Sequence, residues 1–95
     1  MAAYFIAQLN VTNPEGYKTY ASQTKATIEK YGGKFVVRGG DVTPVEGDWK
    51  FSRIVVLEFP DVETAQRWYN SPEYHPLVAL RQANSEGVAI IVEGA

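Results

Sequence analysis

The chain has 95 residues and a net charge of −2, from 9 basic and 11 acidic side chains. This length predicts one compact domain, residues 1–95, and the balanced charge predicts neither a nucleic-acid nor an anionic-membrane partner. There is no cysteine and only one histidine, which excludes disulfides, zinc–thiolate sites, thiol catalysis and a multi-histidine metal centre. We therefore expect no metal site and no cofactor.

The first half of the chain predicts a strand, a helix and a second strand. Residues 4–11 alternate between apolar and more polar side chains, which is the period of a half-buried strand. Asn13 followed by Pro14 predicts the start of a helix, and the glycine pair at 32–33 predicts its end. Residues 35–38 are β-branched or aromatic and predict the second strand.

The second half predicts another strand, a broken helical region and a final strand. Residues 53–59 form the clearest strand of the chain, after a long hairpin loop over 41–52. Asp61 predicts the cap of a second helix, which breaks at residues 70–72 and restarts as a short segment. Residues 88–93 predict the last strand.

This β-α-β-β-α-β order predicts an α+β fold of the ferredoxin-like kind. Right-handed crossovers give a four-stranded antiparallel sheet in the order 4-1-3-2, with two helices on one face. Alternate residues of a strand point to opposite faces of the sheet, and we call each such set a parity. We expect the more apolar parity of each strand to lie under the helices. It comprises Phe5, Ala7, Leu9, Phe35, Val37, Val55, Leu57, Phe59, Val88, Ile90 and Val92.

The opposite parity predicts a sheet face that no helix covers. It comprises Tyr4, Ile6, Gln8, Val36, Arg38, Ile54, Val56, Glu58, Ala89, Ile91 and Glu93. About half of these side chains are aliphatic, more than a solvated sheet face or the exposed patch of a monomer normally carries. We therefore predict a homodimer that packs these faces together around a two-fold axis, so that the two sheets form a barrel. A monomer with a partly apolar sheet face is the alternative.

Polar side chains on this open face are candidates for a site. Arg38 and Glu58 fall on adjacent strands and the same side, with Tyr4 on the next strand. A charge buried in an interface has to be paired or has to meet a ligand, because leaving it alone costs about 3–5 kcal/mol. The pair therefore either fixes the register of the dimer or lines a cavity, with Arg38 holding a carboxylate and Glu58 acting as a base.

His75 is the other candidate for acid–base chemistry. Histidine is the side-chain type suited to proton transfer at neutral pH, and prolines bracket the turn over 71–76 that holds it. The alternative is an exposed histidine at the start of a helix. Trp49 in the long loop is expected to pack against the partner subunit rather than to act as a lid. Three tyrosines at helical spacing are expected in the core: Tyr17, Tyr20 and Tyr31.

Short motifs are spread over essentially the whole chain. They are residues 31–35 (YGGKF), 37–40 (VRGG), 46–49 (EGDW), 53–60 (RIVVLEFP), 68–74 (WYNSPEY) and 92–94 (VEG), with Ala65 and Arg81. Together they resemble a family of small bacterial domains, domain of unknown function 1330, within the dimeric α+β barrel superfamily. The resemblance implies a ferredoxin-like homodimer and no particular activity, since similar folds serve as cofactor-free monooxygenases, lactone isomerases, haem-binding enzymes and binding proteins.

We accordingly expect a cytoplasmic homodimer that binds a small acidic or aromatic molecule in a cavity between sheet and helices. One alternative is a cofactor-independent monooxygenase- or isomerase-like enzyme, and the other is a purely structural dimer. The catalytic candidates are His75 and Glu58. The ligand-binding candidates are Arg38, Tyr4, Arg53, Tyr69, Tyr74 and Arg81; of all these, Arg38, Arg53, Glu58, Tyr69, Tyr74 and Arg81 match the family pattern. No signal peptide and no membrane span is expected.

Overall fold

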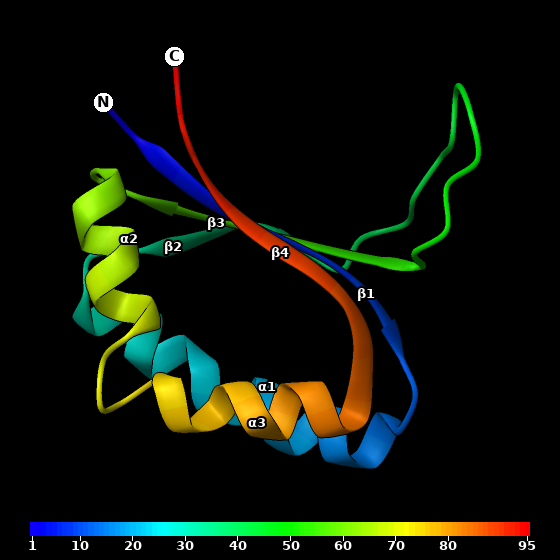
Figure 1. Cartoon of the computed structure of the whole chain (residues 1–95), viewed down its shortest axis with the longest axis horizontal. Coiled ribbons are helices and arrows are strands. Elements are labelled where there is room, and N and C mark those ends of the chain that lie inside the picture. The colour runs from blue at the N-terminus through cyan, green and yellow to red at the C-terminus, as the bar shows by residue number, and fades with distance from the viewer.

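The computed structural model describes residues 1–95 and contains four strands and three helices (Figure 1). The strands are β1 (Ala3–Val11), β2 (Lys34–Arg38), β3 (Arg53–Phe59) and β4 (Ser85–Glu93). The helices are α1 (Pro14–Lys30), α2 (Val62–Tyr69) and α3 (His75–Asn84). All strand pairs are antiparallel, in the order β2-β3-β1-β4. The predicted ferredoxin-like α+β fold and its strand order are therefore confirmed.

All three helices lie on one side of the sheet, as Figure 1 shows. The predicted break in the second helical region is confirmed, since α2 ends at Tyr69 and α3 begins at His75. Helix α3 runs directly into β4, which begins at Ser85 rather than at Val88. None of the helices combines the length and the apolar character that a membrane span requires.

Local signals set the ends of the helices. The Asn13 side chain accepts a hydrogen bond from the Gly16 amide at 3.5 Å before α1 begins. Asp61 does the same for α2, accepting from the Thr64 amide at 2.7 Å. Gly32, which follows the C-cap of α1, has a φ of +76°, a conformation that side chains other than glycine disfavour. These ends agree with the predicted ones.

The core lies between the sheet and the helices. Trp68 of α2 is at its centre, edge-to-face with Phe5 at a centroid distance of 5.1 Å and stacked on Tyr74 at 3.9 Å. Tyr17 and Tyr20 are buried as predicted, whereas Tyr31 is only partly buried. The core is thus rich in aromatic side chains, which pack mainly between α1, α2 and β1.

The parity predicted for the last strand is wrong. Ile91 of β4 pairs with Phe5, so Ile91 lies on the helix side together with Ala89 and Glu93. The side chains expected in the core point to the open face instead: Val88, Ile90 and Val92 are 55%, 54% and 41% exposed. The physical reason is that residues 88–92 are apolar in both parities, so their periodicity defines no buried side.

A β-bulge also changes the second strand. The register of β2 against β3 shifts between Phe35 and Val37. Beyond the bulge, Arg38 lies opposite Val55 on the helix side, and Val37 lies on the open face. The predictions that Arg38 belongs to the open face and Val37 to the core are therefore wrong.

The open face carries aliphatic side chains from every strand. They are Ile6, Val37, Ile54, Val56, Val88, Ile90 and Val92. The loop between β2 and β3 rises on this side of the sheet, away from the helices, and both termini also lie there (Figure 1). The two corrections make this face more apolar than the sequence predicts, because they replace an arginine and a glutamate by valine and isoleucine side chains.

Candidate functional site

A cavity of about 30 Å³ lies between α1 and the helix side of the sheet. This volume holds about two water molecules. Most of its wall is formed by apolar side chains of α1, β1, β2 and β3. The charged side chains that line it are Arg38 and Arg81, and no acidic side chain does so. The site is therefore an apolar slot with two guanidinium groups.

Arg81 of α3 is only 6% exposed. Its Nη1 donates a hydrogen bond to the Tyr74 hydroxyl oxygen at 2.9 Å. Neither ion pair in the structure includes Arg81, so no carboxylate balances its charge. An arginine stays protonated in proteins, and a buried charge without an opposite one is costly. This guanidinium is consequently a strong candidate for contact with an anion.

Two tyrosine hydroxyls extend from Arg81 to α1. The Tyr74 oxygen lies 2.7 Å from that of Tyr20, which lines the cavity. Burial raises the pKa of both tyrosines above the usual tyrosine range, so both remain protonated at neutral pH. When Tyr74 donates to Tyr20, the Tyr20 proton is free to meet a ligand in the cavity.

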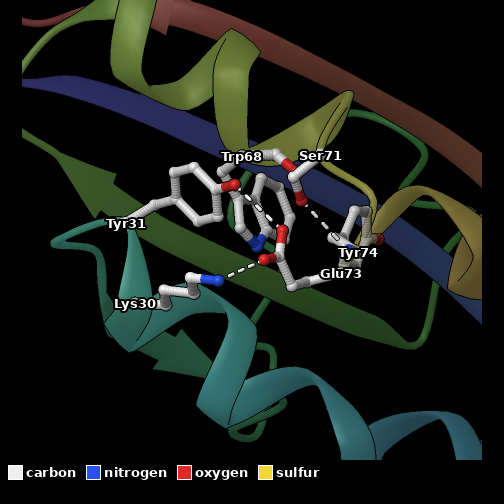
Figure 2. Close-up of polar contacts among 6 residues, drawn as sticks. All are labelled: Lys30, Tyr31, Trp68, Ser71, Glu73 and Tyr74. Atoms are coloured by element: carbon white, nitrogen blue, oxygen red, sulfur yellow. Dashed lines mark hydrogen bonds and ion pairs between the residues drawn. The ribbon is translucent and has the colours of Figure 1, made fainter.

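The turn before α3 fixes the position of Tyr74 (Figure 2). The Ser71 hydroxyl accepts a hydrogen bond from the Tyr74 amide at 3.0 Å. Glu73 accepts a hydrogen bond from the Tyr31 hydroxyl at 2.9 Å and forms an ion pair with Lys30. The turn is therefore fastened to the C-terminal end of α1, and Tyr74 points into the core beside Trp68.

Arg38 lies at the other end of the cavity, next to solvent. Its guanidinium lies over the Phe35 ring, 4.4 Å from the centroid. It lines both the cavity and an outer groove of about 330 Å³ between α1 and β2, which also contains Lys25 and Glu29. Phe35 and Ile28 line both spaces as well. The side chain of Arg38 thus stands where the cavity meets the groove.

A third hollow, of about 220 Å³, lies between α3 and β4. Arg81 and Leu9 line it as well as the cavity, and Tyr69 and Gln82 contribute to its wall. The groove, the cavity and this third hollow therefore follow one another across the helix side of the sheet, from β2 to β4.

Among the predicted site residues that lie outside this row of hollows are Arg53, Tyr4 and Glu58. Arg53 donates a hydrogen bond from Nε to the Tyr17 hydroxyl at 3.1 Å and lies over that ring at 5.2 Å. Tyr4 and Glu58 face each other across β1 and β3 on the open face. Glu58 lies 3.7 Å from the Lys34 ammonium, so the predicted pairing of Glu58 with Arg38 is wrong: the bulge places Arg38 on the other side.

His75 begins α3 and is exposed. Its Nδ1 lies 3.1 Å from the Tyr69 carbonyl oxygen, and its ring is edge-to-face with that of Tyr69 at 5.7 Å. It lines neither the cavity nor the hollows that continue it. The structure therefore places Arg38 and Arg81 along one cavity, with Tyr74 bonded to Arg81. Glu58 lies on the other face of the sheet, and His75 contacts Tyr69 outside the cavity.

Tyr20 is the site residue that sequence reasoning missed. Its spacing on α1 predicts burial, and a buried tyrosine hydroxyl usually has a hydrogen-bond partner. That rule signals a partner for Tyr20 but cannot name Tyr74 or Arg81, which are more than 50 residues away along the chain.

The arrangement defines a ferredoxin-like α+β protein with an apolar cavity and two guanidinium groups. The chain belongs to the family described as Domain of unknown function (DUF1330), which it matches over residues 2–95. No curated protein matches it.

Solved structures of low identity share the fold. A protein of unknown function from Rhodopseudomonas palustris, RPA0582, is 19% identical with a TM-score of 0.81, over 99% of this chain and 82% of that one. SnoaB, a cofactor-independent oxygenase from Streptomyces nogalater, is 14% identical with a TM-score of 0.63, over 99% and 93%. A dimeric ferredoxin-like protein of unknown function from Thermobifida fusca is 15% identical with a TM-score of 0.60, over 99% and 92%.

Proposed function

We propose that the chain binds a small acidic molecule with an aromatic or other apolar body in the cavity between α1 and the sheet. The observation that carries this proposal is Arg81, a buried guanidinium that lines the cavity and has no carboxylate partner. A bound anion would supply the missing opposite charge in surroundings where a charge-assisted hydrogen bond is strong.

The side chains that line the cavity indicate the other contacts that a bound ligand would make. The Arg81 guanidinium is one donor to the acid group, and the Tyr20 hydroxyl is a second. The apolar wall accepts the body of the ligand, and a ligand larger than a few heavy atoms extends past Arg38 into the outer groove. Ligand pockets commonly combine an apolar lining with a few polar groups in this way.

Benzoate and benzamide test the proposal, because they have the same shape and differ in charge. Benzoate is expected to raise the free energy of unfolding in urea, by about 2.7 kcal/mol at a concentration one hundred times its Kd. Benzamide is expected to have little effect. Arg81→Gln keeps a donor for Tyr74 but removes the charge, so it should abolish the benzoate effect.

Arg67→Gln is the matched control, since Arg67 is exposed on α2 and lines none of the hollows. Equal stabilisation by both probes, or an unchanged benzoate effect in Arg81→Gln, would contradict the proposal. If no acidic probe binds while the dimer persists, the chain acts as a purely structural dimer.

We propose further that two copies associate through the open sheet face. Its aliphatic side chains form a wider apolar surface than monomers usually expose. A two-fold axis lets the same surface cover itself. Trp49, 40% exposed on the loop that rises on this side, is proposed to contact the second copy. The similarity to a protein described as dimeric supports this assembly. The cavity lies on the opposite side of the sheet and stays accessible.

A cofactor-independent oxygenase is the second candidate, on the strength of the fold shared with SnoaB. In such an enzyme His75 or Glu58 would serve as the base and a guanidinium would stabilise the anionic intermediate. The geometry supports binding better, because no histidine or carboxylate lines the cavity. Oxygen uptake with a hydroquinone probe, lost in His75→Ala or Glu58→Gln, would favour the enzyme.

A further inference from the structure

We infer that the ligand has two acid groups separated by an apolar middle and lies between Arg81 and Arg38. The inference rests on the proposed binding function and specifies the class of ligand. It follows from three features of the cavity: the placement of its two cations, the absence of acidic side chains in its wall, and its continuity with the outer groove.

The two guanidinium groups lie on the helix side near opposite edges of the sheet. Arg38 belongs to β2, one edge strand, and Arg81 belongs to α3, which packs beside β4, the other edge strand. The backbones of the edge strands are separated by three strand spacings, about 14 Å in total. Both side chains line the cavity between these edges.

The charge of the cavity favours a dianion. Its wall contributes two cations and no carboxylate, so a ligand with one acid group would leave one guanidinium without an opposite charge. At the outer end, Lys25 and Arg38 outnumber Glu29, whereas the ammonium of Lys34 lies against Glu58 on the other face. The outer end is thus cationic, as the inner end is.

The shape of the cavity fits a narrow middle segment. The cavity has a volume of only about 30 Å³ and an almost entirely apolar wall between the two arginines. The groove outside it is about ten times larger, and Arg38 stands at the junction. A short alkyl chain would occupy the slot, with one acid group at Arg81 and the other at Arg38.

Paired probes of the same length test this inference. We expect adipate to bind about fivefold more tightly than hexanoate at constant ionic strength, because the outer carboxylate gains a partly exposed ionic contact. Arg38→Gln should remove this difference and bring the Kd of adipate to that of hexanoate. Succinate and suberate bracket the length, and an optimum between them is expected. Isothermal titration calorimetry with the full chain measures all four Kd values.

The control again is Arg67→Gln, which should preserve the adipate preference. Equal affinity for hexanoate and adipate in the parent protein, or an adipate preference that survives in Arg38→Gln, would overturn the dianion and leave the binding proposal standing. If neither acid binds, both fail. Arg38 is exposed and outside the core, so the decisive variant is expected to fold.

Discussion

Substitution of Ile90 by lysine tests the proposed dimer with a magnitude that the structure supplies. Complete burial of an isoleucine side chain contributes about 1.5–3 kcal/mol. Ile90 is 54% exposed in the single chain, so burying this exposed part in a dimer interface contributes about 0.8–1.6 kcal/mol per copy. The two-fold axis doubles this to about 1.6–3.2 kcal/mol per dimer, which is about 15- to 200-fold in Kd. The two introduced charges raise the Kd further.

Sedimentation velocity over a range of concentrations is the assay. The parent chain is expected to sediment as a dimer, and Ile90→Lys as a 10.6 kDa monomer with an unchanged circular dichroism spectrum. Ala79→Lys adds the same charge on an exposed position of α3, on the helix side, and should leave the dimer intact. A parent chain that is monomeric at high concentration, or an Ile90→Lys variant that dimerises as the parent does, would refute the reasoning.

Three further predictions concern stability and can be measured by urea unfolding. Tyr74→Phe removes the hydroxyl that accepts from Arg81, which should cost about 1–3 kcal/mol; no loss would mean that water replaces it. Hydrogen bonding to Lys30 holds the pKa of the Glu73 carboxyl below its usual range. The ionised Glu73 carboxylate therefore stabilises the fold above its unfolded-state pKa, and this contribution is lost as pH falls through the lower folded-state pKa. The stability of Glu73→Gln should accordingly be less sensitive to acid over that window than the stability of the parent chain. Gly87→Ala places a methyl group against the β1 backbone and should cost about 1–3 kcal/mol, whereas a neutral effect would show that β4 can shift.

The fold could be predicted because its signals are local. Asn13 and Asp61 cap helices through their own side chains, and Gly32 ends α1 through its own backbone conformation. Neither signal depends on distant parts of the chain. Once these ends and the strand between residues 53 and 59 are assigned, the connection rules leave few strand orders.

The facing of the edge strands could not be predicted, because it depends on contacts between strands. The bulge in β2 exists only relative to β3, and it reverses the side on which Arg38 lies. In β4, Gly87 lies opposite Leu9, where its missing side chain allows close approach to β1, and that pairing sets the direction of Ile90. A run of apolar residues alone carries no such information.

Only part of the candidate site could be predicted, because the rest of it also depends on contacts between distant parts of the chain. Arg81 and Tyr74 share the site, but only the fold shows that Tyr20 joins them and that the guanidinium has no carboxylate partner. Glu58 and His75 carry suitable groups, yet the structure places them outside the cavity. The surroundings of a side chain, and above all the charges near it, therefore predict its role in the site better than its residue type does.

The most direct measurement is the NMR signal of the Arg81 side-chain Nε–H group during titration with benzoate at constant ionic strength. The account predicts a saturable shift of this signal with one site per chain, because the carboxylate becomes a new hydrogen-bond acceptor for the buried guanidinium. The Nε–H signal of Arg67 should stay in place. An Arg81 signal that does not move while benzoate saturates the protein would contradict the account, because the anion would then bind elsewhere.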